Sequence, residues 1–372
     1  MNEDKAARYH RLKRRVAVAS ICWSAVLLAG LALTGASGSM RDVAHTMTLA
    51  LRGGEQRGLD LGLYLFGLLA LHEIGDGLLG FYSGFVLERR YGLSMQNAHG
   101  WLADRAKSFA IAFVLGGAAA ALVYWTMGLT LGYWWLLSGA LFAVLFAVLA
   151  ALAPVLLIPL FYTIRPLSSD LLRARLLALA ERAGARVLGA YTWGLGDKTR
   201  RANAALTGIG KTRRILVSDT MLAEYTDDEI EVVLAHELGH HVHGDIWKGL
   251  ALEAALMVGG LFAAAQLLTA SVGRFGVSAI DDIAGLPLLV LAAGGVSLAM
   301  TPAARALSRA HERRADRFAL RLTGNPSAFV SAMRRLGAQN LAEEHPSRLV
   351  QVLFHSHPPL SERIAAANDF RG

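Results

Sequence analysis

The stretch His236-Glu237-Leu238-Gly239-His240 decides how the rest of this chain is interpreted. On an α-helix, two histidines four residues apart lie on one face, one turn above each other, where both imidazoles can reach a single metal ion. Glu237 lies beside them as the candidate general base for an attacking water. The pentapeptide therefore predicts a zinc hydrolase site.

The residues before this stretch predict the helix that the chemistry requires. Thr226-Asp227-Asp228-Glu229 has the Thr-x-x-Glu form of a capping box, in which Thr and Glu satisfy each other's free backbone N–H groups. An apolar run, Ile230 to Leu234, follows it and leads directly into His236. We therefore expect a helix that begins after Thr226 and carries the whole pentapeptide.

A catalytic zinc usually has three protein ligands, so a third must come from elsewhere in the chain. The best candidate is Glu312, in the stretch from Ser308 to Asp316, where Glu312 and Asp316 are again four residues apart. Glu312 would bind the metal, and Asp316 would orient one of the ligand histidines from behind. A solvated helix with arginines beside its carboxylates explains the same pattern without any metal.

The composition indicates an integral membrane protein. The chain is 54% hydrophobic and its mean hydropathy is +0.40, beyond the range of soluble globular proteins. Long apolar runs predict a mostly α-helical polytopic protein with about six transmembrane helices. The predicted spans are Val16–Thr34, Leu59–Leu87, Phe109–Leu131, Tyr133–Ile158, Leu250–Leu268 and Ile283–Met300.

Positive charge predicts the orientation of these spans. Lys and Arg are abundant before the first span, after the second, after the fourth and after the sixth, and scarce in the other connections. Both termini and the HExxH helix are then cytoplasmic, and the first span is expected to be retained rather than cleaved as a signal peptide. Abundant Ala, Leu, Arg and Gly with few Lys indicate a GC-rich bacterium, so the bilayer is expected to be a bacterial inner membrane.

The chain divides into four predicted parts. Residues 1–158 form an N-terminal four-span membrane region, 159–246 a cytosolic insert with the HExxH helix, 247–300 a transmembrane hairpin, and 301–372 a C-terminal cytosolic part with the third ligand. Within the insert, Ala202–Thr207 and Arg214–Ser218 predict a short β-hairpin. Asn203 on this hairpin can hold a substrate backbone by its amide, although a turn-proximal Asn that is satisfied locally is the commoner arrangement.

The net charge of +8 does not require nucleic acid. Topology and attraction to anionic headgroups account for the arginines, and no basic stripe with interleaved aromatic residues is present. Cys22 is the single cysteine, so no internal disulfide can form.

Several further stretches carry a resemblance to a known family. These stretches, taken in order with HELGH and SRAHERRAD (Ser308–Asp316), resemble those of the type I CAAX prenyl proteases. That family consists of membrane-embedded zinc metallopeptidases of the gluzincin class. The additional stretches are Phe81–Leu93, Pro159-Leu160-Phe161 with Pro166-Leu167, Asn203-Ala204 before Gly208, Lys211–Leu222 and His355–Arg363.

The resemblance implies roles for individual residues. It implies one zinc per chain on His236, His240 and Glu312, with Glu237 as general base. It also implies that Asn203 binds the substrate backbone, that His357 faces the reacting carbonyl and that Arg363 lies near it. An imidazole facing the carbonyl suits stabilisation of the oxyanion, whereas a structural histidine before the Pro358-Pro359 turn is the alternative.

The resemblance also implies an architecture. Membrane helices would enclose a chamber, capped by a gluzincin-type zinc protease domain with a small β-hairpin or sheet. The family commonly has seven spans, whereas hydropathy here indicates six.

These observations predict a zinc-dependent membrane endopeptidase similar to the CAAX prenyl proteases. The expected partners are the lipid bilayer and a peptide or protein substrate, either prenylated or membrane-associated. The first alternative is a quality-control metalloprotease of the heat-shock type. The second is a non-catalytic membrane binding protein or carrier with a structural zinc; Glu237 argues against it, because a structural site needs no base.

Overall fold

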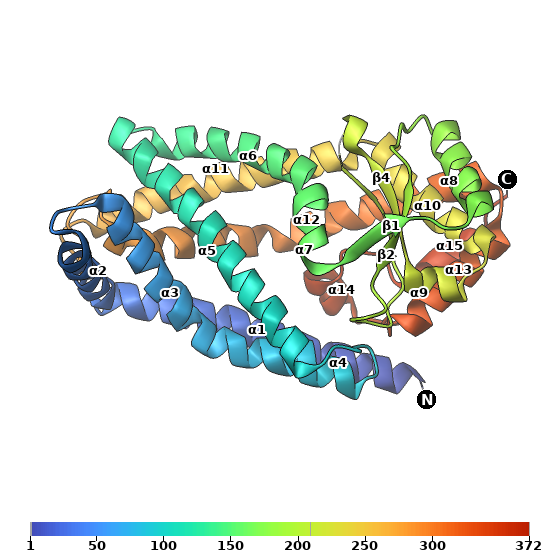
Figure 1. Cartoon of the computed structure of the whole chain (residues 1–372), viewed down its shortest axis with the longest axis horizontal. Helices are drawn as coiled ribbons and strands as arrows, with labels where there is room; N and C mark the ends of the chain where they lie inside the picture. Colours follow the sequence, from blue (N-terminus) through green and yellow to red (C-terminus); the bar gives the residue numbers. More distant parts are fainter. Residues whose placement is uncertain (1, 209, 372) are drawn as a thin grey trace.

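The computed structural model describes residues 2–208 and 210–371. Figure 1 shows an elongated molecule in which long helices extend from a compact domain built around a small β-sheet. Both chain termini lie at the end that carries the sheet. This arrangement agrees with the predicted fold class, a helical membrane region joined to a smaller domain with a small sheet.

Five described helices are long and apolar enough to cross a membrane. A sixth, α6, has a shorter apolar stretch, Trp134–Ala150. Each of the six predicted spans therefore coincides with a helix. The bounds are α1 (Asn2–Leu33), α3 (Arg57–Gly80, continued by the π-helix η1, Phe81–Val86, and by α4, Leu87–Arg90), α5 (Ala98–Leu129), α6 (Trp134–Leu156), α11 (Asp245–Ser271) and α12 (Leu286–Thr323).

The sequence analysis missed one helix of the membrane region, α2 (Ala36–Arg52), and treated it as a connection. Figure 1 places α2 at the end of the molecule farthest from the sheet. Its Ser37 hydroxyl donates to the carbonyl of Ala284, 2.6 Å away, and lies 2.6 Å from the Tyr64 hydroxyl. Hydropathy could not reveal α2, because charged and polar residues are distributed along a short amphipathic segment.

Ionisable residues inside the second predicted span pair with a neighbouring helix. The Arg105 guanidinium of α5 donates to Glu73, 2.5 Å away, and to Asp76, 2.8 Å away, both on α3. Charged groups at membrane depth are costly unless they are paired or hydrated, so these contacts hold α3 and α5 together without leaving an isolated charge.

The sheet has four strands in the order β1-β2-β4-β3. Its strands are β1 (Thr163–Pro166), β2 (Ala190–Gly194), β3 (Ala204–Thr207) and β4 (Arg214–Ser218). Strands β3 and β4 pair antiparallel with Ala204 opposite Val217, which confirms the predicted hairpin. Because β3 is at the edge of the sheet, one side of its backbone is not used by another strand.

Helices cover this sheet and complete the domain. The helices of this domain are α7 (Ile158–Phe161), α8 (Asp170–Arg182), η2 (Gly210–Thr212), α9 (Asp219–Glu224), α10 (Asp227–Val242), α13 (Pro326–Gln339), α14 (Arg348–Phe354) and α15 (Leu360–Asn368). The short helix η3 (Ile283–Gly285) precedes α12 at the other end of the molecule, against α2. The largest apolar core of the described residues joins α8, β4, α10 and α13 through Leu176, Ile215, Leu234 and Phe329, all at most 1% exposed. This core fixes α10 against the sheet.

Candidate metal centre

The helix that carries the pentapeptide begins where the sequence predicted. The Glu229 N–H donates to the Thr226 hydroxyl at 3.3 Å, and the Thr226 N–H donates to the Glu229 carboxylate at 2.8 Å. Glu229 is 2% exposed and also accepts from Ser331, at 2.5 Å, and from Arg335, at 2.9 Å, both on α13. One buried carboxylate thus caps α10 and fixes its first turn to α13.

The third candidate ligand lies on α12, a continuous helix of 38 residues that includes Pro302. It packs along α10 at Gly239 of the pentapeptide. A Cβ at Gly239 would lie 3.0 Å from the Cα of Ala315, a tighter contact than most Cβ atoms make. The absence of a side chain at Gly239 therefore lets the two backbones come close enough for Glu312 to face both histidines.

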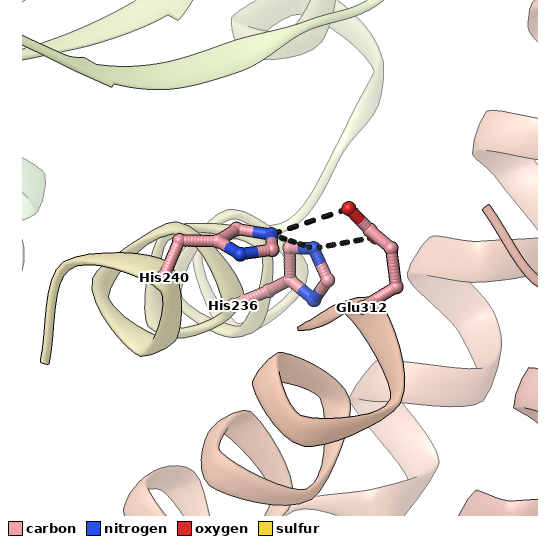
Figure 2. Close-up of side chains that lie close together, drawn as sticks. All are labelled: His236, His240 and Glu312. Atoms are coloured by element: carbon pink, nitrogen blue, oxygen red, sulfur yellow. Dashed lines mark hydrogen bonds and ion pairs between the residues drawn. The ribbon is translucent and has the colours of Figure 1, made fainter. Parts of the chain in front are cut away.

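Three side chains converge between these helices (Figure 2). The Nε2 atoms of His236 and His240 are 3.3 Å apart. Glu312 places one carboxylate oxygen 3.2 Å from the first and the other 3.3 Å from the second. One donor atom from each of the three residues lies within 4.8 Å of the others, and this is the only such His, Cys, Asp and Glu group among the described residues.

The other ring nitrogen of each histidine contacts a buried carboxylate. Nδ1 of His236 lies 2.8 Å from Asp316, and Nδ1 of His240 lies 3.0 Å from Asp245. A carboxylate at Nδ1 fixes the ring and the tautomer, so that Nε2 presents a lone pair to a metal. Arg363 donates to both oxygens of Asp316, at 2.8 and 2.6 Å, and Arg314 pairs with Asp245.

Asp245 was not singled out in the sequence, although a signal was available. It follows Gly244, whose φ of 67° is in the left-handed region that ends α10 and reverses the chain. An acidic residue just beyond such a turn returns toward the last turn of the helix, where His240 lies.

Burial and the neighbouring carboxylates act in opposite directions on the pKa of the histidines. Burial lowers the pKa of His236, but Asp316 and Glu312 raise it by more, to about 9. Burial also lowers the pKa of His240, but Glu312 and Asp245 together raise it by more. Without a metal, the neighbouring carboxylates therefore favour the protonated form of His236 at neutral pH.

The residues present fit a metal ion. Oxygen Oε2 of Glu312 is buried without a hydrogen-bond partner in the described part of the chain. It lies 2.7 Å from Nδ1 of His357 and 3.2 Å from Nε2 of His236, but neither contact has hydrogen-bonding geometry. A buried carboxylate requires a positive partner, which is the protonated His236 in the metal-free protein and would be a cation between Glu312 and the two Nε2 atoms when metal is bound.

A cleft of about 510 Å³ opens beside this centre and brings together the remaining candidate residues. Asn203, His236, Glu237, His357 and Arg363 all line it. A second cavity, of about 340 Å³, lies beyond the centre and is lined by Glu237, His240 and Glu312. Glu237 therefore faces both spaces, and no hydrogen bond occupies its carboxylate in the described part of the chain.

The three candidates outside the helix pair differ in their surroundings. The backbone of Asn203 is hydrogen-bonded to Ser218 through both its N–H and its carbonyl. Its exposed side-chain amide has no hydrogen-bond partner among residues 2–208 and 210–371. His357 is 60% exposed and points toward Glu312. Arg363 is 13% exposed and lies behind His236, bound to Asp316.

Comparison with known proteins agrees with this geometry. The model of peptidase family M48 matches residues 166–371, more than half of the chain. The chain belongs to peptidase family M48. Residues 2–163 match the model described as the CAAX prenyl protease N-terminal region with five membrane helices. In that range the structure has the long helices α1, α3, α5 and α6 and the shorter α2.

Two M48 relatives and one solved structure show how far the similarity extends. An uncharacterized metalloprotease of Bacillus subtilis, YhfN, is 32% identical over 76% of this chain and 68% of its own length. An Arabidopsis thaliana CAAX prenyl protease 1 homolog is 28% identical over 82% of this chain and 72% of its own length. The crystal structure of Ste24p from S. mikatae has the same fold, with a TM-score of 0.84 at 23% identity over 98% of this chain and 88% of that one.

Family membership establishes the broad function. The M48 chain described here is a multi-pass membrane metallopeptidase that acts on peptides or proteins and uses a metal ion. Membership of this family favours an enzyme over the alternative of a non-catalytic membrane carrier.

Proposed function

We propose that this M48 peptidase is a zinc-dependent endopeptidase with one zinc per chain, held by His236, His240 and Glu312. The convergence of their donor atoms within 4.8 Å, around a carboxylate oxygen that lacks a hydrogen bond, is the observation that carries the proposal. When bound there, zinc supplies Lewis-acid polarisation of a peptide carbonyl and activation of water. Asp316 and Asp245 keep the ligand rings oriented.

Glu237 is proposed as the general base. Its carboxylate lines the cleft beside the ligand histidines and has no hydrogen-bond partner among the described residues. It would accept a proton from the attacking water and deliver it to the departing amine. His357, at the rim of the same cleft, would donate a hydrogen bond to the oxyanion.

The substrate backbone is proposed to lie along the edge strand β3. Ala204 lines the cleft, and Leu206 lines the second cavity, so the free edge leads past Glu237 from one space to the other. An extended peptide pairing there gains main-chain hydrogen bonds without a strict sequence requirement. The free amide of Asn203 would bind the peptide backbone, and Arg363 would act through Asp316 near the reacting carbonyl.

We further propose that residues 159–246 and 301–372 together form the peptidase domain, and that residues 1–158 and 247–300 form the membrane region with its chamber. The contacts between α10 and α12 support this division, because each helix brings part of the ligand set. The distribution of Lys and Arg supports a cytoplasmic active site and, for a bacterial chain, location in the inner membrane.

Replacement of Glu237 and Glu312 tests the assignment. Glu237→Gln should abolish peptide cleavage and retain one zinc per chain, because Glu237 handles protons and does not bind the metal. Glu312→Ala should lose the zinc. Metal analysis and cleavage of an unstructured peptide by the purified protein provide the two readouts, and either full activity in Glu237→Gln or normal zinc content in Glu312→Ala would contradict the roles.

The substrate class needs its own experiment. The relatives named as CAAX prenyl proteases favour a prenylated substrate, and a lipid chain contributes about 0.8 kcal/mol for each CH₂ that is buried. A farnesylated CAAX peptide should then be cleaved with a kcat/KM far above that of its unlipidated twin. Equal rates, together with cleavage of unfolded membrane segments, would instead support the quality-control alternative while leaving the zinc peptidase intact.

A further inference from the structure

The cytoplasmic end of α1 is folded against the peptidase domain. Tyr9 is 1% exposed and packs in an apolar cluster with Leu87, Leu93 and Leu341, and its hydroxyl accepts from Arg201 of the peptidase domain at 2.6 Å. The next residue, His10, lines the same cleft as Glu237. The basic segment before the first span therefore also forms part of the wall of this cleft, and it contacts α4 through Glu88.

An ion pair joins α1 to the loop between α13 and α14. Arg14 donates through Nη1 to one oxygen of Glu343 at 2.5 Å and through Nη2 to the other at 3.4 Å. The side chains are 19% and 11% exposed, so the pair is largely removed from water. Loss of either partner would leave the other as a poorly solvated charge, which is far more costly than loss of a surface pair.

The same loop holds a residue in an unfavourable backbone conformation. Leu341 has a φ of 50°, a region that side chains other than glycine rarely adopt. Its side chain packs on the cluster around Tyr9, and its carbonyl lies 2.7 Å from Nε2 of His10. Contacts from α1 thus compensate for the strain that turns the loop toward the cleft.

Glu343 in turn contacts the loop that carries His357. Its Oε2 atom lies 3.6 Å from Nε2 of His355, and both residues line the cleft. On the other side, Arg309 of α12 donates to the carbonyls of His355, at 2.9 Å, and Gln351, at 3.0 Å. The segment just before His357 is therefore held between α12 and a carboxylate that α1 fixes.

We infer that Glu343 is a positioning residue for the loop of His357, and that Arg14 on the first membrane helix sets the position of Glu343. The inference rests on the proposed peptidase function, in which His357 supports the transition state. A displaced His357 would weaken an interaction that forms mainly in the transition state, so kcat should fall while KM changes little. Asn203 and β3 are not part of the displaced loop, so substrate binding along β3 should be retained.

A charge exchange tests this coupling. Arg14→Glu and Glu343→Arg should each lower kcat by about 10- to 100-fold, as expected for a misplacement near 1 Å. The double variant Arg14→Glu/Glu343→Arg should recover at least tenfold of this loss, because the pair is restored with reversed polarity. If a reversed charge prevents folding, Glu343→Gln is used instead, because it removes the charge and keeps the shape of the side chain. It should also lower kcat.

Arg11→Glu is the matched control, since Arg11 is exposed on the same helix, has no partner among the described residues and carries the same orienting charge. It should retain the kcat of the unsubstituted enzyme. Single variants that behave like Arg11→Glu, or a double variant no better than the singles, would overturn the inference.

A second readout does not depend on turnover. In a Cys22→Ser, Glu237→Gln background, Ser356→Cys places the only thiol on the His357 loop, and its reaction rate with a maleimide reports the mobility of that loop. Arg14→Glu should accelerate labelling at least severalfold, and Arg11→Glu should not. If the unsubstituted enzyme cleaves no peptide, the proposed function is refuted and the labelling result remains valid. If Arg14→Glu cleaves normally and its labelling rate is unchanged, only the coupling is refuted.

Discussion

Gly239 on α10 faces Ala315 on α12 so closely that a methyl group between them would force a shift, since a Cβ at Gly239 would lie 3.0 Å from the Ala315 Cα. Ala315 is fully buried, so neither backbone can move aside without disturbing the packing of the domain. This contact sets the distance between the histidine pair and Glu312.

Gly239→Ala should therefore destabilise the protein by about 1–3 kcal/mol, the usual cost of overpacking. It should also reduce zinc content, because α12 would be displaced with its ligand. Thermal unfolding and metal analysis provide the measurements. Gly249→Ala on α11 is the control, since no atom lies within 4 Å of its added Cβ, and equal behaviour of the two variants would contradict the packing argument.

Asp245→Asn should weaken zinc binding by about 10- to 100-fold without removing a ligand. Asp245 contacts Nδ1 of His240 at 3.0 Å, and its charge both orients the ring and makes Nε2 a better donor. Competition with a chelator measures the affinity. Asp369→Asn, at an exposed position in the C-terminal turn, should bind zinc normally. Unchanged affinity in Asp245→Asn would show that His240 needs no such support.

Zinc affinity should increase with pH up to about 9 and become level above it. In the metal-free protein the pKa of His236 is raised from 6.5 to about 9, against the effect of burial, so binding must displace a proton throughout this range. The stability that charged His236 gives the metal-free protein is complete below pH 6.5 and is lost as the pH rises through 9. Chelator competition and thermal unfolding between pH 6 and 10 test both trends.

Asp316→Asn should shift this plateau to lower pH, because the carboxylate that raises the pKa of His236 is then neutral. An affinity independent of pH below 9 would exclude a proton on His236 in the metal-free state.

Membrane topology gives a prediction independent of the metal. In a Cys22→Ser background, cysteines at Glu181 and Asp369 should react only from the cytoplasmic side, and a cysteine at the exposed Val43 of α2 only from the opposite side. The Lys and Arg distribution requires this arrangement. Labelling of Glu181→Cys from outside would reverse the orientation, and labelling of Val43→Cys from the cytoplasm would place α2 at the wrong end.

Local patterns in the sequence predicted local structure well. The spacing of His236 and His240, the capping box at Thr226 and the hairpin around Gly208 all depend on neighbours within a few residues, and the described geometry agrees with them. Apolar runs likewise located the helices that cross the membrane, because hydropathy alone determines where a helix can be surrounded by lipid.

Long-range contacts were harder to predict. Glu312 was proposed from its spacing to Asp316, but nothing in the spacing of either helix required it to meet His236. The pairing of Arg14 with Glu343 was missed, because charges before a first span already have a sufficient explanation in topology. Only packing of α1 against a loop more than 300 residues away gives that arginine a second role.

The continuity of α12 joins the ligand set to the bilayer. From Leu286 to Glu312 the helix is about 39 Å long at 1.5 Å per residue, so a tilt of about 5° about the Gly239–Ala315 contact moves its membrane end by about 3 Å. A bilayer thinner than the apolar length of the helix favours such a tilt. Lipids of unequal chain length should therefore strain the contact at Gly239 and change the stability of the metal centre, while the packing keeps Glu312 beside the two histidines.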